Sequence, residues 1–291
     1  MLGQAVLETL RDKYTLFATA SRPVEARLPG NPAFLSFNLT EKDFSPLARF
    51  CSPDIIINCA ALTDHAACNG DPDLAEALNA TAVAQLTKAF PSAYLIHISS
   101  DAVFGACVVN AREEDVAEPQ TIYGWSKRKG EELLLAGNSR YVILRTTVVG
   151  LGGRRKTPSF AEWTLRSLER KTPAGLYTDV LFTPISVWDF AGILSWCIVH
   201  RPEGILHAGG GESLSRHAFG LLLAKYCGLS ADTIVATRFS DTRGDRGKRL
   251  DQSLDSQRLG KLLGRAMPDG AQCALSIAHR YSLFKTTQDM V

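Results

Sequence analysis

Short apolar runs alternate with helical patterns through the first half of this 291-residue chain. Residues 54–61 and 94–100 are apolar for most of their length, which is typical of strands buried on both faces. Apolar residues recur at helical spacing over 2–12, 72–90 and 123–135. Strands that alternate with helices of this length predict βαβ units and a parallel sheet with helices on both faces. The fold class is therefore α/β.

The character of the chain changes after about Gly150, where a basic, loop-like stretch begins. We therefore expect a first domain over 1–150 and mainly a smaller α+β substrate-binding lobe over 151–291. The remaining strands are predicted over 14–20, 34–37, 141–149, 204–208 and 233–239, and the remaining helices over 44–50, 160–170, 187–200, 215–227 and 253–263.

Composition and charge exclude several classes of protein. Hydrophobic residues make up 45% and charged residues 21%, so intrinsic disorder is excluded. The net charge of +2 predicts neither a nucleic-acid nor a membrane partner. Seven cysteines without a Cys-x-x-Cys pair argue against zinc and disulfides, so we expect no metal and a reducing, cytoplasmic location without a signal peptide.

One local cluster of cations stands out against this balance. Arg238, Arg243, Arg246, Lys248 and Arg249 face only two aspartates in the same stretch. The cluster is either a solvated loop or a site for a small anion such as one or two phosphates.

Three features at strand ends or on one helix can carry chemistry. Ser99-Ser100-Asp101 follows the apolar run that ends at residue 98, and Tyr123 and Lys127 are four residues apart on a predicted helix face. A nearby ammonium is expected to lower the pKa of the phenol, so that Tyr123 delivers a proton while Ser100 polarises a carbonyl. The small residues Cys59-Ala60-Ala61 would let a flat cofactor approach the backbone. Tyr-x-x-x-Lys alone is a weak signal, because both residues are common on helix surfaces.

Together these motifs resemble the extended short-chain dehydrogenases/reductases, in the branch of dTDP-4-dehydrorhamnose reductase. The resemblance is carried by Pro53–Thr63, Asp71-Pro72, Asn79-Ala80, Ile98–Gly105, Tyr123–Lys127, Gly130-Glu131, Arg145-Thr146, Pro184-Ile185, Asp189–Ala191, Gly204–Ala208 and Arg249–Asp251. It implies a Rossmann-type doubly wound sheet that binds NAD(P), and hydride transfer to or from a sugar nucleotide.

The resemblance assigns roles to individual residues. The catalytic set is Ser100, Tyr123 and Lys127, of which Lys127 would also hold the nicotinamide ribose. Cofactor contacts are expected at Gly3, Arg22, Cys59, Ala60, Ala61, Ser99, Tyr123 and Lys127, and substrate contacts at Asp101, Val103, Phe104 and Arg249. Asn79 would lie near the site or serve as a cap or core residue. A homodimer is possible.

Arg22 bears on the choice between the two nicotinamide cofactors. It follows the second predicted strand at a position where an acidic residue selects NAD and a basic residue accepts the 2′-phosphate of NADP. NADP(H) is therefore favoured over NAD(H), with a solvated loop arginine as the alternative.

The amino terminus departs from the family pattern. A Rossmann domain opens with a strand and a glycine-rich turn, whereas Met1-Leu2-Gly3-Gln4 corresponds only to the tail of that motif. The first strand is central, so its loss predicts a gap with unpaired ladder groups. Either the start is incomplete, which we favour, or dinucleotide binding has been lost.

Residues expected to contact the substrate also depart from the family pattern, among them Ala102 and Val148. These departures put the identity of the sugar in doubt. The expected activity is NADPH-dependent reduction of a 4-keto nucleotide sugar, with Tyr123 as the acid. The alternatives are an epimerase or dehydratase of the same superfamily, and a non-catalytic regulatory subunit, since the chain is also similar to the beta subunit of methionine adenosyltransferase.

Overall fold

The two buried runs of the sequence become neighbouring strands of a parallel sheet. The computed structural model describes residues 1–23, 28–106, 108–137, 140–152, 158–239 and 250–288. In it β3 (Ile55–Asn58) pairs with β4 (Tyr94–Ser100), β4 with β5 (Tyr141–Thr146), and β5 with β10 (Gly204–His207), all in parallel. The predicted α/β, Rossmann-type architecture is confirmed.

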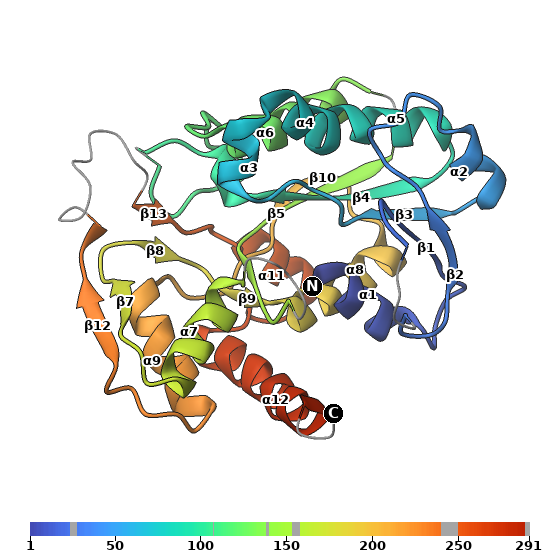
Figure 1. Ribbon diagram of the computed structural model, residues 1–291. Coiled ribbons are helices and arrows are strands. Elements are labelled where there is room, and N and C mark those ends of the chain that lie inside the picture. Colours follow the sequence, from blue (N-terminus) through green and yellow to red (C-terminus); the bar gives the residue numbers. More distant parts are fainter. Residues whose placement is uncertain (24–27, 107, 138–139, 153–157, 240–249, 289–291) are drawn as a thin grey trace.

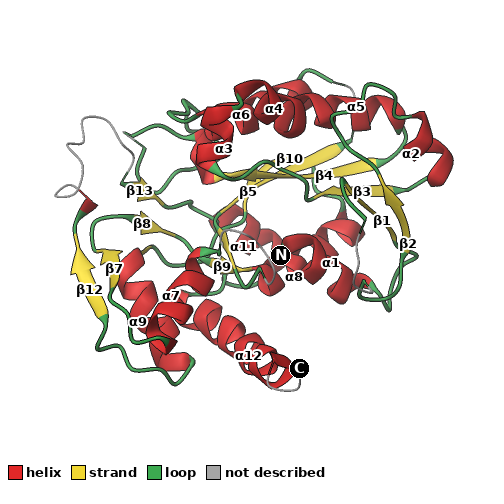
Figure 2. Cartoon of the chain, viewed as in Figure 1, coloured by secondary structure: helices red, strands yellow, loops and turns green. Residues whose placement is uncertain are grey.

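Helices cover both faces of this sheet, as Figures 1 and 2 show. On one face lie α1 (Leu2–Leu10) and α8 (Val187–His200), which pack against each other. Their apolar sides bury Ala5, Val6, Leu10, Phe190, Ile193 and Leu194 against Ile96, Val142 and Leu144 of the sheet. On the other face lie α3 (His65–Gly70), α4 (Pro72–Glu76), η1 (Ala77–Thr81), α5 (Ala82–Ala89) and α6 (Ile122–Leu135).

The second lobe has its own small sheets and core. Phe182, Phe219, Leu165 and Ile277 are buried together at its centre. Its elements are α7 (Phe160–Glu169), β7 (Ala174–Tyr177), β8 (Leu181–Phe182), β11 (Leu214–Ser215), α9 (Arg216–Tyr226), β12 (Ile234–Thr237), β13 (Asp251–Gln252) and α12 (Gly270–Gln288). β12 pairs with β7 in parallel, and β8 lies between β11 and β13.

The chain crosses between the lobes more than once. After α7 and β7 it returns to the large lobe through β9 (Ile185–Ser186), which pairs with β6 (Val148–Val149). It then adds α8 and β10 before it re-enters the second lobe at β11. Residues after 150 therefore contribute to both lobes.

The structure corrects two predicted elements. The helix expected over 72–90 is interrupted by the π-helical turn η1, where the Asn79 side chain hydrogen bonds to the backbone of Leu62 and to Ser126. The strand expected over 141–149 divides at Thr147, whose hydroxyl bonds to Thr183, so that β6 joins a different strand pair.

Near the carboxyl end, two further differences appear. The helix expected over 253–263 begins only at α11 (Gln257–Leu263), because Ala111 donates its N–H to the carbonyl of Ser253 and accepts the N–H of Asp255. The helix α12 was not predicted. Leu275 and Leu283 on it are about half exposed, so its apolar residues do not mark a single buried face.

The amino-terminal side of the sheet is divided. β1 (Phe17–Ala20) and β2 (Ala33–Ser36) form a separate parallel pair, followed by α2 (Ser45–Phe50). Among the described residues, β1 pairs only with β2, and β3 only with β4. The predicted gap next to two unpaired strand edges is therefore present. Within the described part of the chain, no helix is both long and apolar enough to cross a membrane.

Candidate active site

A large cavity separates the two lobes at the carboxyl ends of the parallel strands. Its volume is about 1440 Å³. One wall comes from the ends of β3, β4 and β5, from the start of α1 and from α6. The other comes from the second lobe, with Trp163, Tyr177, Phe182, Arg216 and Gln252. This is the place where ligands bind in open α/β sheets.

Ser100 stands at the last position of β4, where the strand turns into the short helix η2 (Asp101–Val103). Its hydroxyl donates to a carboxylate oxygen of Asp101 at 2.9 Å and accepts the N–H of Ala102 at 3.2 Å. The side chain is thus capping η2 while it faces the cavity. Both Ser100 and Asp101 lie where the sequence places them.

Tyr123 lies in the first turn of α6, which Thr121 caps by accepting the N–H of Gly124 at 3.0 Å. The helix starts close to η2, because a Cβ on Gly124 would lie only 2.1 Å from the carbonyl oxygen of Ala102. This close approach brings the phenol to Ser100, with which it hydrogen bonds. The ring of His65 contacts it, with centroids 5.2 Å apart.

The pKa of Tyr123 is raised to about 12, first by burial and further by the charges of Asp101 and Cys68. The Ser100 hydrogen bond opposes this rise. The sequence predicts the opposite direction, on the basis of a nearby Lys127 ammonium. In the structure that amine is drawn toward His97 instead, with Nζ 3.4 Å from the ring Nε2. Tyr123 is therefore a protonated acid at neutral pH.

Lys127 is 1% exposed, one helical turn after Tyr123. Burial lowers the pKa of its amine to about 8, while the charge of Glu131 acts in the opposite direction. His97 is also fully buried, and burial together with the Lys127 charge lowers the pKa of its imidazole well below the usual value. The other ring nitrogen of His97 is 3.5 Å from the amide nitrogen of Asn58. Asn58, His97 and Lys127 thus form a polar chain across β3, β4 and α6.

A buried ion pair fixes α6 to the sheet behind these groups. Arg145 of β5 donates to both carboxylate oxygens of Glu131, at 2.9 and 2.7 Å. The Ser99 hydroxyl donates to the same carboxylate at 2.6 Å, and the guanidinium lies 4.8 Å from the ring centroid of Phe104. A second tight contact lies further along α6, where a Cβ on Gly130 would be 2.4 Å from the carbonyl of Asn79.

The cavity lining includes most of the predicted site residues. These are Gly3, Cys59, Ala60, Ala61, Ser99, Ser100, Asp101, Phe104, Tyr123 and Lys127. Asn79 supports the site from behind as a buried core residue.

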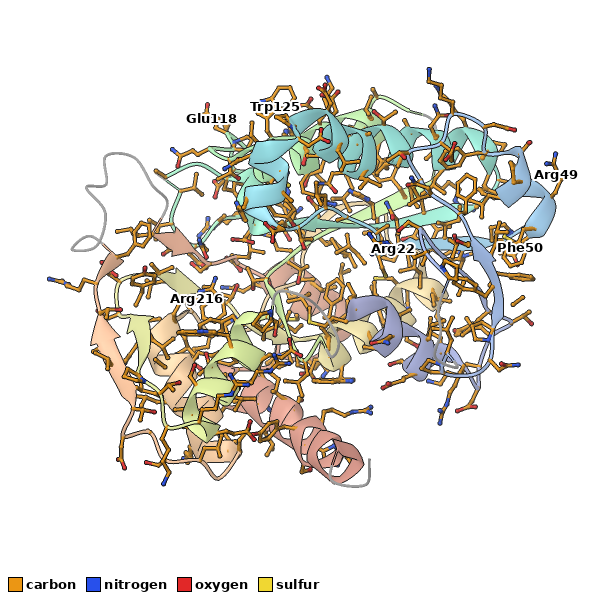
Figure 3. The ribbon with its side chains drawn as sticks, in the orientation of Figure 1. Arg22, Arg49, Phe50, Glu118, Trp125 and Arg216 are labelled. Carbon is orange, nitrogen blue, oxygen red and sulfur yellow. The ribbon has the colours of Figure 1, made fainter. Side chains whose placement is uncertain are left out.

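Two predicted site residues do not line the cavity, and a third lies outside the described residues. Val103, the last residue of η2, is completely buried in a small apolar cluster and does not line the cavity. Arg22 is exposed beside the carboxyl end of β1, outside the described lining residues (Figure 3). Arg249 lies outside the described residues. The same holds for its cation cluster except Arg238, which is exposed.

The second wall of the cavity was missed by sequence reasoning. Arg216, at the start of α9, stacks its guanidinium 3.8 Å from the ring centroid of Phe182 and donates to Gln252 at 2.8 Å (Figure 3). Burial lowers the pKa of Arg216 to about 10, opposed by the charge of Asp101. The group is still a cation at neutral pH. The signal in the sequence that could have indicated Arg216 is its position directly after Ser215, because serine is a good helix N-cap residue.

Comparison with known proteins agrees with this geometry. Residues 1–269 match the RmlD substrate binding domain family. The chain is 31% identical to the Bacillus subtilis spore coat polysaccharide biosynthesis protein SpsK over 71% of this chain and 72% of that protein. It is 28% identical to dTDP-4-dehydrorhamnose reductase of Salmonella typhimurium over 68% of each chain.

Solved structures share the fold. A hypothetical dTDP-4-dehydrorhamnose reductase from Sulfolobus tokodaii is 28% identical, with a TM-score of 0.76 over 92% of this chain and 93% of that one. The Bacillus anthracis dTDP-4-dehydrorhamnose reductase in complex with NADP is 22% identical, with a TM-score of 0.73 over 83% of this chain and 86% of that one. With its paired sheet, its Ser-Tyr-Lys cavity and this match over most of its length, the chain belongs to the RmlD substrate binding domain family of the extended short-chain dehydrogenases/reductases.

Proposed function

We propose that this protein is an NADPH-dependent reductase that acts on the C4 ketone of a nucleotide sugar. The observation that carries the proposal is the convergence of Ser100, Tyr123 and Lys127 on one cavity whose opposite wall presents a buried cation, Arg216. The relatives named dTDP-4-dehydrorhamnose reductase support the same reaction class.

Tyr123 is the proton donor in this scheme. Its pKa of about 12 keeps the phenol protonated at neutral pH, which suits the direction in which a carbonyl oxygen gains a proton. Ser100 lies beside it and can turn its hydroxyl from Asp101 to the carbonyl oxygen, which stabilises the negative charge that develops there. Lys127, with a pKa of about 8, is mostly a cation at pH 7, and its Nζ lies 3.4 Å from His97 Nε2.

The residues on the large-lobe wall fit a dinucleotide. Cys59, Ala60 and Ala61 are small and line the cavity after β3, and Lys127 is placed to bind ribose hydroxyls. The first turn of α1, at Gly3, carries no side-chain cap and no acidic residue, so its N–H groups suit a pyrophosphate. When bound, the nicotinamide supplies the hydride.

NADP is favoured over NAD because of the residues that follow β1. Ser21-Arg22-Pro23 includes an exposed cation and no acidic residue, which suits a 2′-phosphate. Replacement of Arg22 by Glu should raise the Kd for NADPH about tenfold or more while leaving that for NADH nearly unchanged. An equal change for both cofactors would contradict this role.

The second-lobe wall is suited to the nucleotide diphosphate of the substrate. Arg216 uses one donor on Gln252, and the charge of Asp101 on the opposite wall acts on its guanidinium. Its remaining N–H groups can bind phosphate oxygens, beside the aromatic rings of Trp163 and Tyr177. Arg249 is proposed to add a second cation to this subsite, and Asp101 to contact the sugar. Phe104 supports the sugar site from beneath, since it is 2% exposed.

The test is NADPH oxidation with a dTDP-4-keto-6-deoxy sugar by the wild type and by Tyr123→Phe. Loss of the acid should lower kcat/KM by about 10²–10⁴-fold while NADPH binding, measured by fluorescence, is retained. Tyr14→Phe is the matched control, because it removes an exposed phenol that does not line the cavity. If Tyr123→Phe reduces the sugar as fast as the wild type does, the mechanism is wrong. A stable wild-type chain that binds no NADP(H) but captures a protein partner would favour the regulatory alternative.

A further inference from the structure

We infer that a second cavity, at the carboxyl end of β10, binds a small phosphate ester of sugar-phosphate size, with Lys261 and Arg265 as the cations that hold the phosphate. The volume of this second cavity is about 510 Å³. Small-molecule sites in proteins typically measure about 300–1,000 Å³. The inference concerns binding outside the large cavity between the lobes, and it does not depend on the proposed reductase activity.

The second cavity is separated from the large cavity by a shared wall. Among the described residues, the linings of the two cavities have no residue in common. Thr147 lines the large cavity and Thr183 lines the second one. The Thr147 hydroxyl donates to the Thr183 carbonyl, so this hydrogen bond lies in the wall between them. A ligand in the second cavity therefore contacts a different set of side chains.

A glycine turn after β10 forms the back of the second cavity. A Cβ on Gly210 would lie only 2.4 Å from the carbonyl oxygen of Pro184. A Cβ on Gly211 would lie 2.6 Å from the carbonyl oxygen of Met267. The N–H of Gly210 also donates to the Thr183 carbonyl at 3.0 Å. These contacts fix the turn against two other segments of the chain, and the cavity lies between the turn and α11.

The open side of the second cavity carries two cations. Lys261 lies in the last turn of α11 and Arg265 lies just beyond its end, and both are exposed and line the cavity. The helix ends at Gly264, whose φ of 64° is left-handed, and the N–H of Arg265 bonds back to the Gly260 carbonyl at 3.2 Å. This turn keeps Arg265 beside the last turn of α11. Lysine and arginine side chains are common ligands of phosphate oxygens.

The carboxylate of the cavity lining is already paired with other groups. Asp255 lies 3.8 Å from the guanidinium of Arg112 and accepts the N–H of Gln257 at 2.9 Å. Within the described part of the chain, neither Lys261 nor Arg265 takes part in an ion pair. The open side of the cavity therefore carries positive charge that can attract an anion.

Behind the cations, the lining suits the hydroxyl groups of a sugar. The Ser256 hydroxyl accepts the N–H of Gly209 at 2.9 Å, and the residue is only 4% exposed. No described residue accepts its own O–H, which leaves a buried donor for a ligand oxygen. The other uncharged polar side chains of the lining, apart from Thr183, are Asn110, Ser213 and Gln257. A sugar phosphate offers the matching groups, because it combines one anionic group with several hydroxyls.

The test measures binding of glucose-1-phosphate to the full chain by isothermal titration calorimetry, with inorganic phosphate and gluconate as comparison ligands. We expect glucose-1-phosphate to bind about tenfold or more tightly than either, because only it combines a phosphate with a ring of hydroxyls. Lys261→Ala/Arg265→Ala should raise its Kd about tenfold or more. Lys88→Ala/Arg166→Ala is the matched control and should leave the Kd unchanged, since it removes the same charge from exposed residues that line neither cavity.

Arg216→Met separates the second cavity from the large one, because it removes the cation of the large cavity and keeps an apolar stem against Phe182. Binding that is retained in Arg216→Met and weakened in Lys261→Ala/Arg265→Ala supports the site. Loss of binding in a folded Arg216→Met protein overturns it. Unchanged binding in Lys261→Ala/Arg265→Ala, equal affinity for the three ligands, or no binding to the wild type at millimolar concentration also overturns it. Calorimetry requires no turnover, so failure of the reductase activity leaves the result intact.

Discussion

The two sides of the large lobe differ in how completely their polar groups are paired. On the β4–β5–α6 side, strands are bonded on both edges and the charges of Glu131 and Arg145 meet in a bidentate pair. On the β1–β3 side, β1 and β3 each pair with only one neighbour among the described residues, and the isoleucines of β3 are half-buried. Ser100, Tyr123 and Lys127, proposed to carry the reaction, stand on the first side, and Cys59, Ala60 and Ala61, proposed to contact the cofactor, follow β3 on the second. The two sides are linked by side chains, since His97 lies between Asn58 of β3 and Lys127 of α6.

The largest expected effect comes from breaking the buried ion pair on the paired side. Glu131→Gln leaves the Arg145 guanidinium buried beside a neutral amide, which should lower the free energy of unfolding by about 3–5 kcal/mol. Urea unfolding followed by circular dichroism measures this loss. The control is Glu203→Gln in the exposed pair with Arg140, whose atoms are 3.6 Å apart and which should change stability by at most about 1 kcal/mol. Equal losses in the two variants would contradict the comparison.

The buried Lys127 should make stability depend on pH. Burial lowers its pKa from 10.5 to about 8, so between these values the unfolded chain binds more protons than the folded chain. The free energy of unfolding should therefore rise with pH across this window, by an amount on the order of 3 kcal/mol. Lys127→Met should be more stable than the wild type near pH 7 and should lose this rise. Urea titrations at successive pH values test it, and an identical pH slope for both proteins would refute the assignment.

Helix packing at the site should respond to a single methyl group. Gly124→Ala places a Cβ against the backbone carbonyl of Ala102, so we expect a loss of about 1–3 kcal/mol and a displaced Tyr123. Gly192→Ala on the exposed side of α8 is the matched control, because a Cβ there meets nothing within 4 Å. It should raise stability by up to about 1 kcal/mol. Thermal unfolding of the two variants should shift in opposite directions.

The smallest expected effect concerns amide hydrogen exchange in β1 and β3, compared with β4 and β5. Amides of β4 and β5 should exchange only through global unfolding. Amides of β1 and β3 should exchange through local opening, about tenfold faster. This ratio corresponds to a free energy of opening that is about 1.4 kcal/mol lower. Native-state hydrogen exchange at low denaturant measures both sets. Equal protection of all four strands would show that the divided sheet behaves as one cooperative unit.

Periodicity and strand-end chemistry were sufficient to predict the parallel sheet, most helices and the convergence of Ser100, Tyr123 and Lys127. These features depend on local spacing and on which strand ends share an edge. The π-helical turn at Asn79 could not be predicted, because it depends on hydrogen bonds to Leu62 and Ser126, which are distant in sequence. The direction of the Tyr123 pKa was wrong for the same kind of reason. It depends on burial and on His97, which draws the Lys127 amine.

The second-lobe wall shows the same limit. Arg216 meets Phe182 and Gln252 only after β8, α9 and β13 have assembled. Nothing in the spacing of these three residues along the chain indicates that contact. By contrast, the separation of the β1–β2 pair from β3 was predicted, because Met1-Leu2-Gly3-Gln4 corresponds only to the tail of the family's opening motif.

The return of α8 and β10 to the large lobe has a consequence for synthesis on the ribosome. When the first 150 residues have emerged, β5 still lacks its partner β10, and α1 still lacks the surface of α8 on which it packs. Native packing of the first lobe must therefore wait until about 60 more residues, including α7 and β7–β9, have left the exit tunnel, which at typical elongation rates takes about 3–12 seconds. During that interval the apolar face of α1 is a natural target for chaperones that bind nascent chains.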